Sequence, residues 1–145
     1  MMFIHKKANI ALLAFGLSFT ALPAFAEIVV IVSAKSAATA LTEEQAADVF
    51  LGKSNTLPGG GQAVPVDQSE SSAVREQFYT KVAGKTGAQM KAYWSKLIFT
   101  GKGQAPKDAG DSAAVKALVA GNPNIIGYID KSAADATVKV LLTIK

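Results

Sequence analysis

A group of serines stands where the sequence passes from the short apolar run AVPV into a helical pattern, in the stretch PVDQSESSAVREQF. Ser69, Ser71 and Ser72 are therefore expected around the first turn of a helix, whose first backbone N–H groups have no partners within the helix. Hydroxyls, free amides and the positive end of the helix dipole together favour a phosphate-like oxyanion. Serine is also a common N-cap that needs no ligand, and cap chemistry alone favours that simpler interpretation.

Arg75 adds a positive charge to the same region of the helix, where it opposes the helix dipole. An acidic group is therefore expected nearby to offset this charge. One alternative is an acid of the protein itself, Glu70 or Asp67, which would form a structural ion pair with Arg75. The other is a bound oxyanion, which the guanidinium group would hold by hydrogen bonds. Both alternatives stay open, and the candidate oxyanion site consists of Ser69, Ser71, Ser72 and Arg75.

Residues 1–26 have the features of a secretory signal peptide. Two lysines precede an apolar stretch that ends in AFA, a small-x-small cleavage pattern. We expect cleavage before Glu27, a single domain at residues 27–145, and a periplasmic location if the cell has two membranes. No other apolar run approaches the ~20 residues that a membrane span needs.

The missing residue types exclude several kinds of chemistry. The chain has no cysteine, and its single histidine, His5, lies in the predicted signal peptide. Without these residues the remaining chain cannot build a Ser-His-Asp or Cys-His nucleophile, nor the usual kind of zinc site. Carboxylate and Ser-Lys catalysis stay open, but the sequence nominates no pair of acids in a cleft. We therefore expect a protein that is not an enzyme and that has no cofactor or metal.

The positive charge of this chain is unevenly distributed. Loss of Lys6 and Lys7 with the signal peptide lowers the net charge from +4 to +2, while residues 75–107 contain seven cations and one acid, Glu76. Such a block either faces an anionic partner or spreads over solvated helix faces, and the second is the more common case. We expect no nucleic-acid partner.

Three other patterns have simpler explanations than a site. LGKS ends like a nucleotide-binding P-loop, but the glycine that should stand five residues before Gly52 is absent, and Gly52 is better explained as the end of a helix. Glu44 and Asp48 lie one turn apart and are expected to be solvated. A stripe at helical spacing predicts core packing rather than a cofactor site, and it comprises Met90, Tyr93, Trp94 and Leu97.

Periodicity and capping signals predict an α/β fold, with a mixed sheet flanked by helices in a single three-layer domain. EIVVIVS is a continuously apolar, β-branched run, typical of a buried strand. Capping boxes formed by Thr42 with Gln45 and by Thr86 with Gln89 start two helices. The predicted elements are a strand at 27–33, a helix at about 43–51, a strand at 63–66, a helix within 71–84, the longest helix after Thr86, a surface loop at 100–110, a helix ending at 120, and strands at 125–130 and 138–144.

Two blocks of this chain resemble the periplasmic phosphate-binding proteins, which have the type II solute-binding fold. FLGK, residues 50–53, is similar to a family (F/Y)LGK segment, and IIGY, residues 125–128, is similar to a family GxIGY strand. The resemblance runs from Leu41 to the end of the chain and is weak between the two blocks. It implies one lobe of a two-lobed clamp, in a small member related to the binding components of phosphate ABC transporters.

The family holds phosphate in this lobe by a basic pair at the end of a strand and a Ser-Gly-Thr turn that opens the next helix. Carried over, the turn falls on SSAV, residues 71–74, so the serines match while the glycine and threonine do not. The basic pair falls on Asp67 and Gln68. The family's positive charge is therefore absent from its place, and Arg75 stands elsewhere.

The family buries its anion between two lobes, whereas residues 27–145 are long enough for about one lobe. Two hypotheses follow. In the first, the protein binds phosphate or a similar oxyanion, weakly by itself or tightly together with a second copy or a membrane partner protein. In the second, it is an extracytoplasmic interaction or structural module that keeps the fold without ligand binding.

Overall fold

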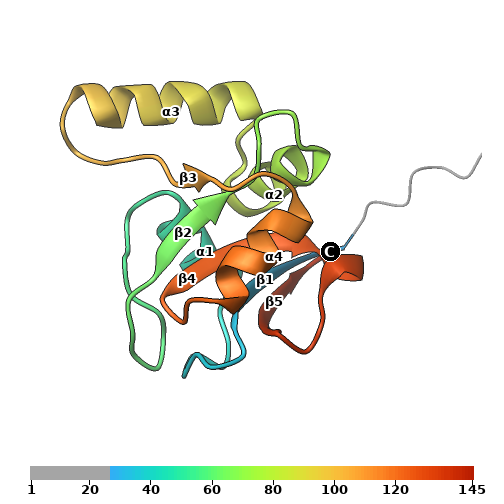
Figure 1. Ribbon diagram of the computed structural model, residues 1–145. Helices are drawn as coiled ribbons and strands as arrows, with labels where there is room; N and C mark the ends of the chain where they lie inside the picture. The colour runs from blue at the N-terminus through green and yellow to red at the C-terminus, as the bar shows by residue number, and fades with distance from the viewer. Residues whose placement is uncertain (1–26) are drawn as a thin grey trace, which may run out of the picture.

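The computed structural model describes residues 27–145. The predicted signal peptide, residues 1–26, lies outside the described residues. Figure 1 shows the elements in chain order. They are β1 (Ile28–Ser33), α1 (Glu43–Phe50), β2 (Val64–Asp67), α2 (Ala73–Ala83), α3 (Gly87–Phe99), β3 (Lys107–Asp108), α4 (Ser112–Ala120), β4 (Ile125–Asp130), the 3₁₀ turn η1 (Lys131–Ala133) and β5 (Val138–Ile144).

The strands form one mixed sheet, in the order β3-β2-β4-β1-β5. β1 runs antiparallel to both β4 and β5, whereas β2 runs parallel to β4 and to β3. All six residues of β1 are buried, as its continuous β-branched sequence predicts. The predicted α/β class, with helices flanking a mixed sheet, is confirmed.

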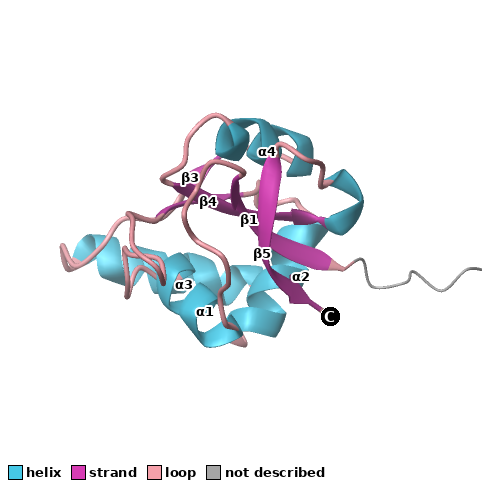
Figure 2. Cartoon of the chain, turned by 90° about the horizontal axis from the view of Figure 1, so that it is seen from below, coloured by secondary structure: helices cyan, strands magenta, loops and turns pink. Residues whose placement is uncertain are grey.

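Helices cover both faces of the sheet (Figure 2). On one face α4 packs over a cluster that includes Val29 of β1 and Val115 of α4. On the other face α1, α2 and α3 pack over a larger cluster, which includes Val30, Phe78 and Tyr128. Successive side chains of a strand point to opposite faces, so β1 contributes alternately to the two clusters.

The helices begin and end at the predicted signals. Thr42 and Thr86 each accept a backbone N–H from the glutamine three residues later, and each glutamine side chain accepts the cap N–H in return. Ser72 caps α2 and Asp111 caps α4 in the same way, by accepting a backbone N–H. Gly52 follows α1 with a φ of 75°, in the left-handed region where glycine commonly ends a helix.

The Met and aromatic stripe of α3 packs into the core, as predicted. Met90 is fully buried, Trp94 is 6% exposed, and Tyr93 and Leu97 pack against the same cluster. The hydroxyl of Tyr93 donates to the carbonyl of Leu51 over 2.7 Å, which ties α3 to the end of α1.

The predicted loop at residues 100–110 contains a short strand, so the prediction of three consecutive helices was wrong. β3 lies between α3 and α4 and pairs parallel with β2, with Val66 opposite Lys107 and Asp67 opposite Asp108. The N–H of Ala109 also donates to the carbonyl of Asp67 over 2.8 Å. Both residues of β3 are exposed. A strand this short and this polar has no hydrophobic period, so only the edge of β2 identifies it.

Within residues 27–145 no helix combines the length and apolar character needed to cross a bilayer. Every strand of the sheet and both hydrophobic clusters lie in this range. The described part of the chain thus has a sheet and a buried core of its own.

Candidate functional site

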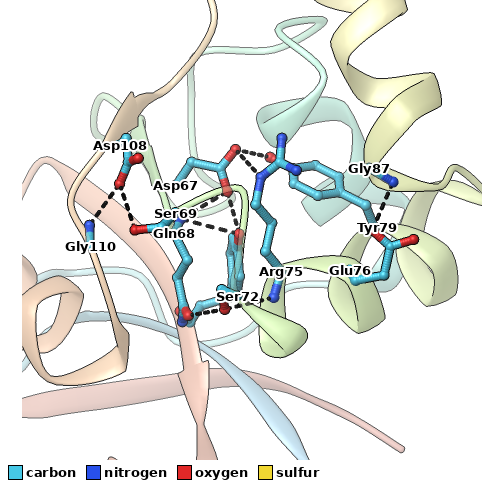
Figure 3. Close-up of polar contacts among 11 residues, drawn as sticks. Asp67, Gln68, Ser69, Ser72, Arg75, Glu76, Tyr79, Gly87, Asp108 and Gly110 are labelled. Carbon is cyan, nitrogen blue, oxygen red and sulfur yellow. Dashed lines mark hydrogen bonds and ion pairs between the residues drawn. The ribbon is translucent and has the colours of Figure 1, made fainter.

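The polar stretch that follows β2 is organised around a buried carboxylate, Asp67, which is 5% exposed (Figure 3). Its Oδ2 accepts a hydrogen bond from the hydroxyl of Tyr79 over 2.9 Å and lies 3.4 Å from Nε of Arg75. Its Oδ1 accepts from the hydroxyl of Tyr128 and, over 2.9 Å, from the backbone N–H of Gln68. Asp67 thus has four donors, three of which join β2 to α2 and β4.

The two tyrosines hold their protons tightly in this environment. Burial raises the pKa of Tyr79 and of Tyr128, and the negative charge of Asp67 raises both further. Burial is the largest single effect on the pKa of Arg75 and lowers it, but the charge and hydrogen bond of Asp67 together with the two tyrosines outweigh burial, and the pKa is raised. Around neutral pH the arginine is therefore a cation and the two phenols are neutral.

Arg75 pairs with Asp67, which was one of the two acids predicted as its partner within the protein. The side chain is largely buried, and its guanidinium carbon also lies 5.2 Å from the centre of the Tyr79 ring. Among the described residues no ion pair joins Arg75 to Glu70, although both line the same hollows beside α3. Its charge is thus offset by a residue of the same chain.

Gln68 connects the starts of two helices. Its side chain is buried, and its Nε2 donates to Oγ of Ser112 over 3.1 Å and to the carbonyl of Tyr128 over 2.9 Å. Its Oε1 accepts from Oγ of Ser72 over 2.7 Å. The amide therefore holds the N-terminus of α2, at Ser72, and that of α4, at Ser112, in a fixed relation to the end of β2.

The three predicted serines line one groove of about 480 Å³, between the N-termini of α2 and α4 and the turn after β4. Ser72 uses its Oγ as the cap of α2, where it accepts the N–H of Arg75 over 3.2 Å. Ser69 donates to Oδ1 of Asp108 over 3.4 Å. Ser71 is exposed and makes no side-chain hydrogen bond with another described residue. We name this surface the serine groove; Arg75 does not line it.

The charges around the serine groove are negative. Asp111 and Asp130 both line it, and no lysine or arginine is among the described residues that do. Both acids accept backbone N–H groups, Asp111 from Ala114 and Asp130 from Ser132, each over 2.9 Å. The groove therefore offers hydroxyls next to two carboxylates, and the cation predicted for it, Arg75, pairs with Asp67 and lines two other hollows instead.

Sequence reasoning missed Gln68 and the two tyrosines as parts of this region. Tyr128 lies 61 residues from Asp67 in the chain, and Ser112 lies 44 residues from Gln68. No local pattern brings such residues together, although the position of Asp67 and Gln68 directly after a strand was visible. No cluster of three or more His, Cys, Asp or Glu side chains suited to a metal occurs within the described range.

No family model and no curated protein matches this chain. Solved structures of phosphate-binding proteins are similar to it in fold. A putative phosphate ABC transporter substrate-binding protein with bound phosphate, from Clostridium perfringens, has a TM-score of 0.63 and 24% identity over 80% of this chain and 45% of its own. An ABC-type phosphate transport receptor from Vibrio cholerae has a TM-score of 0.63 and 20% identity over 80% and 46%. PstS from Borrelia burgdorferi has a TM-score of 0.57 and 18% identity over 80% and 47%.

This chain therefore spans about half the length of the phosphate-binding proteins that it matches. At these identities the similarity is one of fold, and it agrees with the five-stranded mixed sheet and the helices on both of its faces. The resemblance first noted in FLGK and IIGY is thus confirmed at the level of the fold. The described chain has the fold of the phosphate-binding proteins, restricted to one lobe of a type II periplasmic binding protein.

Proposed function

We propose that this protein is an extracytoplasmic solute-binding protein, related to the binding components of phosphate ABC transporters, that binds phosphate or a similar oxyanion in the serine groove. The observation that carries the proposal is that Ser69, Ser71 and Ser72 line one groove where α2 and α4 both begin. The similar structure from Clostridium perfringens, which holds phosphate, supports the same class of ligand. Relatives of this kind are transport receptors, which favours binding over catalysis.

In this proposal the hydroxyl of Ser71 donates a hydrogen bond to the anion, and that of Ser69 does so by exchanging its 3.4 Å bond to Asp108. The first amides of α2 and α4 face the anion from the helix N-termini. Ser72 contributes chiefly by starting α2, since its oxygen already accepts the N–H of Arg75. Arg75 belongs to the proposed site as a positioning residue, because Asp67 holds its guanidinium group.

The proposed affinity is low for the chain by itself. Asp111 and Asp130 repel an anion in a groove open to solvent, and no cation on the groove offsets them in the described part of the chain. We expect a dissociation constant in the millimolar range, which corresponds to about 4 kcal/mol of binding energy. Tighter binding would need a second copy or a membrane partner protein to cover the groove and add positive charge.

One observation favours the second hypothesis, an interaction or structural module that keeps the fold without binding a ligand. The only arginine of the chain is engaged by Asp67, and the basic pair of the family is replaced by Asp67 and Gln68. These residues make a self-sufficient polar cluster that needs no anion to complete it.

Amide chemical-shift titration of residues 27–145 with sodium phosphate and then with sodium sulfate, at constant ionic strength, tests the proposal. We expect saturable shifts at the first turns of α2 and α4 in the millimolar range. Ser71→Ala is the sharpest variant, because Ser71 is exposed and holds no structural hydrogen bond. Loss of one hydrogen bond to a charged group weakens binding by about tenfold or more. Ser95→Ala, an exposed serine on α3 outside the groove, is the matched control.

A titration that moves no amide of the serine groove at millimolar anion would eliminate the anion site and leave the ligand-free module. Shifts confined to the lysine-rich side of the molecule would have the same consequence. Equal binding by Ser71→Ala and by the unaltered chain would remove Ser71 from the site.

A further inference from the structure

The C-terminal end of α3 carries the most exposed large hydrophobic side chain of the described residues. Phe99 is 92% exposed and its neighbour Ile98 is 54% exposed. The end of α3 and the loop that follows it lie at the outer edge of the molecule in both ribbon views (Figures 1 and 2). We name Ile98 and Phe99 the α3 tip.

The rest of α3 is firmly held, so the tip is presented on a fixed support. Met90 and Trp94 are buried in the core, and the N–H of Gly87 at the start of the helix donates to Oε2 of Glu76 over 2.8 Å. After the tip, the N–H of Lys102 returns to the carbonyl of Leu97 over 2.9 Å. The packing that orders α3 does not cover Phe99.

Lysines flank the tip in the sequence, and several of them are exposed. Residues 77–107 contain six lysines and no acid. Four of them are exposed on α3, the following loop and β3, namely Lys91, Lys96, Lys102 and Lys107. Three acids, Asp67, Glu70 and Asp108, line a hollow that Lys91 and Ile98 share. Asp67 pairs with Arg75, and Asp108 accepts hydrogen bonds from Ser69 and Gly110.

An exposed aromatic side chain among exposed lysines has the chemistry of a surface that meets anionic lipid. The apolar side chain enters the boundary between headgroups and acyl chains, while the lysines remain at the level of the headgroup phosphates. Lysine is depleted in protein–protein interfaces, whereas clusters of lysine are attracted to negatively charged membranes. Because the tip projects from the molecule, it can reach a broad layer of lipid headgroups without a matching pocket on a partner protein.

We propose that the α3 tip docks this protein on membranes that contain anionic lipids, with Phe99 and Ile98 inserted at the interface and Lys96 and Lys102 among the headgroups. This contact lies apart from the serine groove and does not depend on ligand binding there. It would hold the described part of the chain at a membrane surface.

Vesicle flotation with residues 27–145 tests the docking surface. We expect binding to vesicles of phosphatidylcholine and phosphatidylglycerol in equal parts, little binding to phosphatidylcholine alone, and release at high salt. Replacing both tip residues, Ile98→Ser with Phe99→Ser, should lower the partition coefficient by about tenfold or more. Lys96→Gln and Lys102→Gln should each lower it by about fivefold.

The controls separate the tip from general charge and apolar exposure. Val140→Ser removes a side chain that is 42% exposed on β5, and Lys35→Gln removes an exposed lysine outside the block, and both should leave binding unchanged. Because the chain has no cysteine, Ser95→Cys, one turn before Phe99, takes an environment-sensitive fluorophore at a single place. Its emission should shift to the blue with anionic vesicles, and that of labelled Thr39→Cys should not.

No binding to anionic vesicles at low salt would overturn the proposal and make an acidic protein surface the partner to seek. Binding that survives replacement of both tip residues would overturn it as well. Circular dichroism of each variant establishes that the loss of binding does not come from unfolding.

Discussion

Asp67 is the residue on which the polar region after β2 depends. A buried carboxylate loses its hydration, and only paired and hydrogen-bonded surroundings compensate for that loss. Here two phenols, one backbone N–H and the guanidinium group of Arg75 supply the compensation. The family resemblance places a phosphate-binding cation at the position of Asp67. In this chain Asp67 instead accepts the hydrogen bonds of an internal polar cluster.

We expect the ion pair between Arg75 and Asp67 to stabilise the fold far more than a surface pair does. Removal of either partner, in Asp67→Asn or Arg75→Met, leaves the other group buried without its counter-charge and should cost about 3 kcal/mol of unfolding free energy. The double variant should cost less than the sum of the two, by about 2 kcal/mol. Urea denaturation followed by the fluorescence of Trp94, the single tryptophan, measures all three values.

The exposed pair between Lys131 and Glu27 is the control for this cycle. Its side chains are 61% and 40% exposed, so solvent screens the pair and its coupling energy should lie well below that of the buried pair. Equal coupling energies for the buried and the exposed pair would contradict a structural role for Arg75.

At the level of the elements, α4 sits close to the sheet because β4 has a glycine beneath it. A Cβ added at Gly127 would lie 2.5 Å from Cγ1 of Val115 and 3.2 Å from Cγ2 of Val119, both on α4. The approach of α4 also brings Ser112, in its first turn, to the side chain of Gln68. The spacing between helix and sheet thus helps to shape one wall of the serine groove.

Gly127→Ala should therefore destabilise the protein by about 1–3 kcal/mol, because valine side chains have few rotamers with which to make room. Thermal denaturation measured by circular dichroism gives this value. Gly121→Ala is the matched control: the glycine has a φ of −83°, and its added Cβ would meet nothing closer than 3.7 Å. We expect a change within about 0.5 kcal/mol there. Similar losses at both positions would show that α4 does not depend on the close approach.

At the scale of the whole molecule, the buried phenols of Tyr79 and Tyr128 link stability to alkaline pH. Both pKa values are raised by burial and then by Asp67, so the folded state keeps two protons that the unfolded state releases near pH 10. Their contribution is complete below pH 10 and is lost as the pH rises above that value. Each phenol should lower the unfolding free energy by about 1.4 kcal/mol per pH unit there.

Urea denaturation at a series of pH values between neutrality and pH 11 measures this slope. Tyr79→Phe removes one of the two groups, so the slope above pH 10 should decrease by about 1.4 kcal/mol per pH unit. An unchanged slope in Tyr79→Phe would show that its phenol ionises as readily in the folded protein as in the unfolded chain.

The sequence by itself determined the features that depend on neighbouring residues. The β-branched run of β1 is buried at every position, and the capping boxes of Thr42 and Thr86 start α1 and α3 as predicted. These signals are local, since a cap acts within about one turn and a strand pattern within a few residues. The FLGK and IIGY blocks also indicated the fold that the solved structures share with this chain.

Only the tertiary structure decided how the polar residues are joined. Arg75 had an acid eight residues away in Asp67 and another five away in Glu70, and the choice followed from the buried side of α2 and from Tyr79 and Tyr128 around Asp67. The same holds for β3, which is a strand only because the edge of β2 is free to pair with it. These outcomes depend on which surfaces pack together, and sequence separations of 44 and 61 residues leave no local pattern to record them.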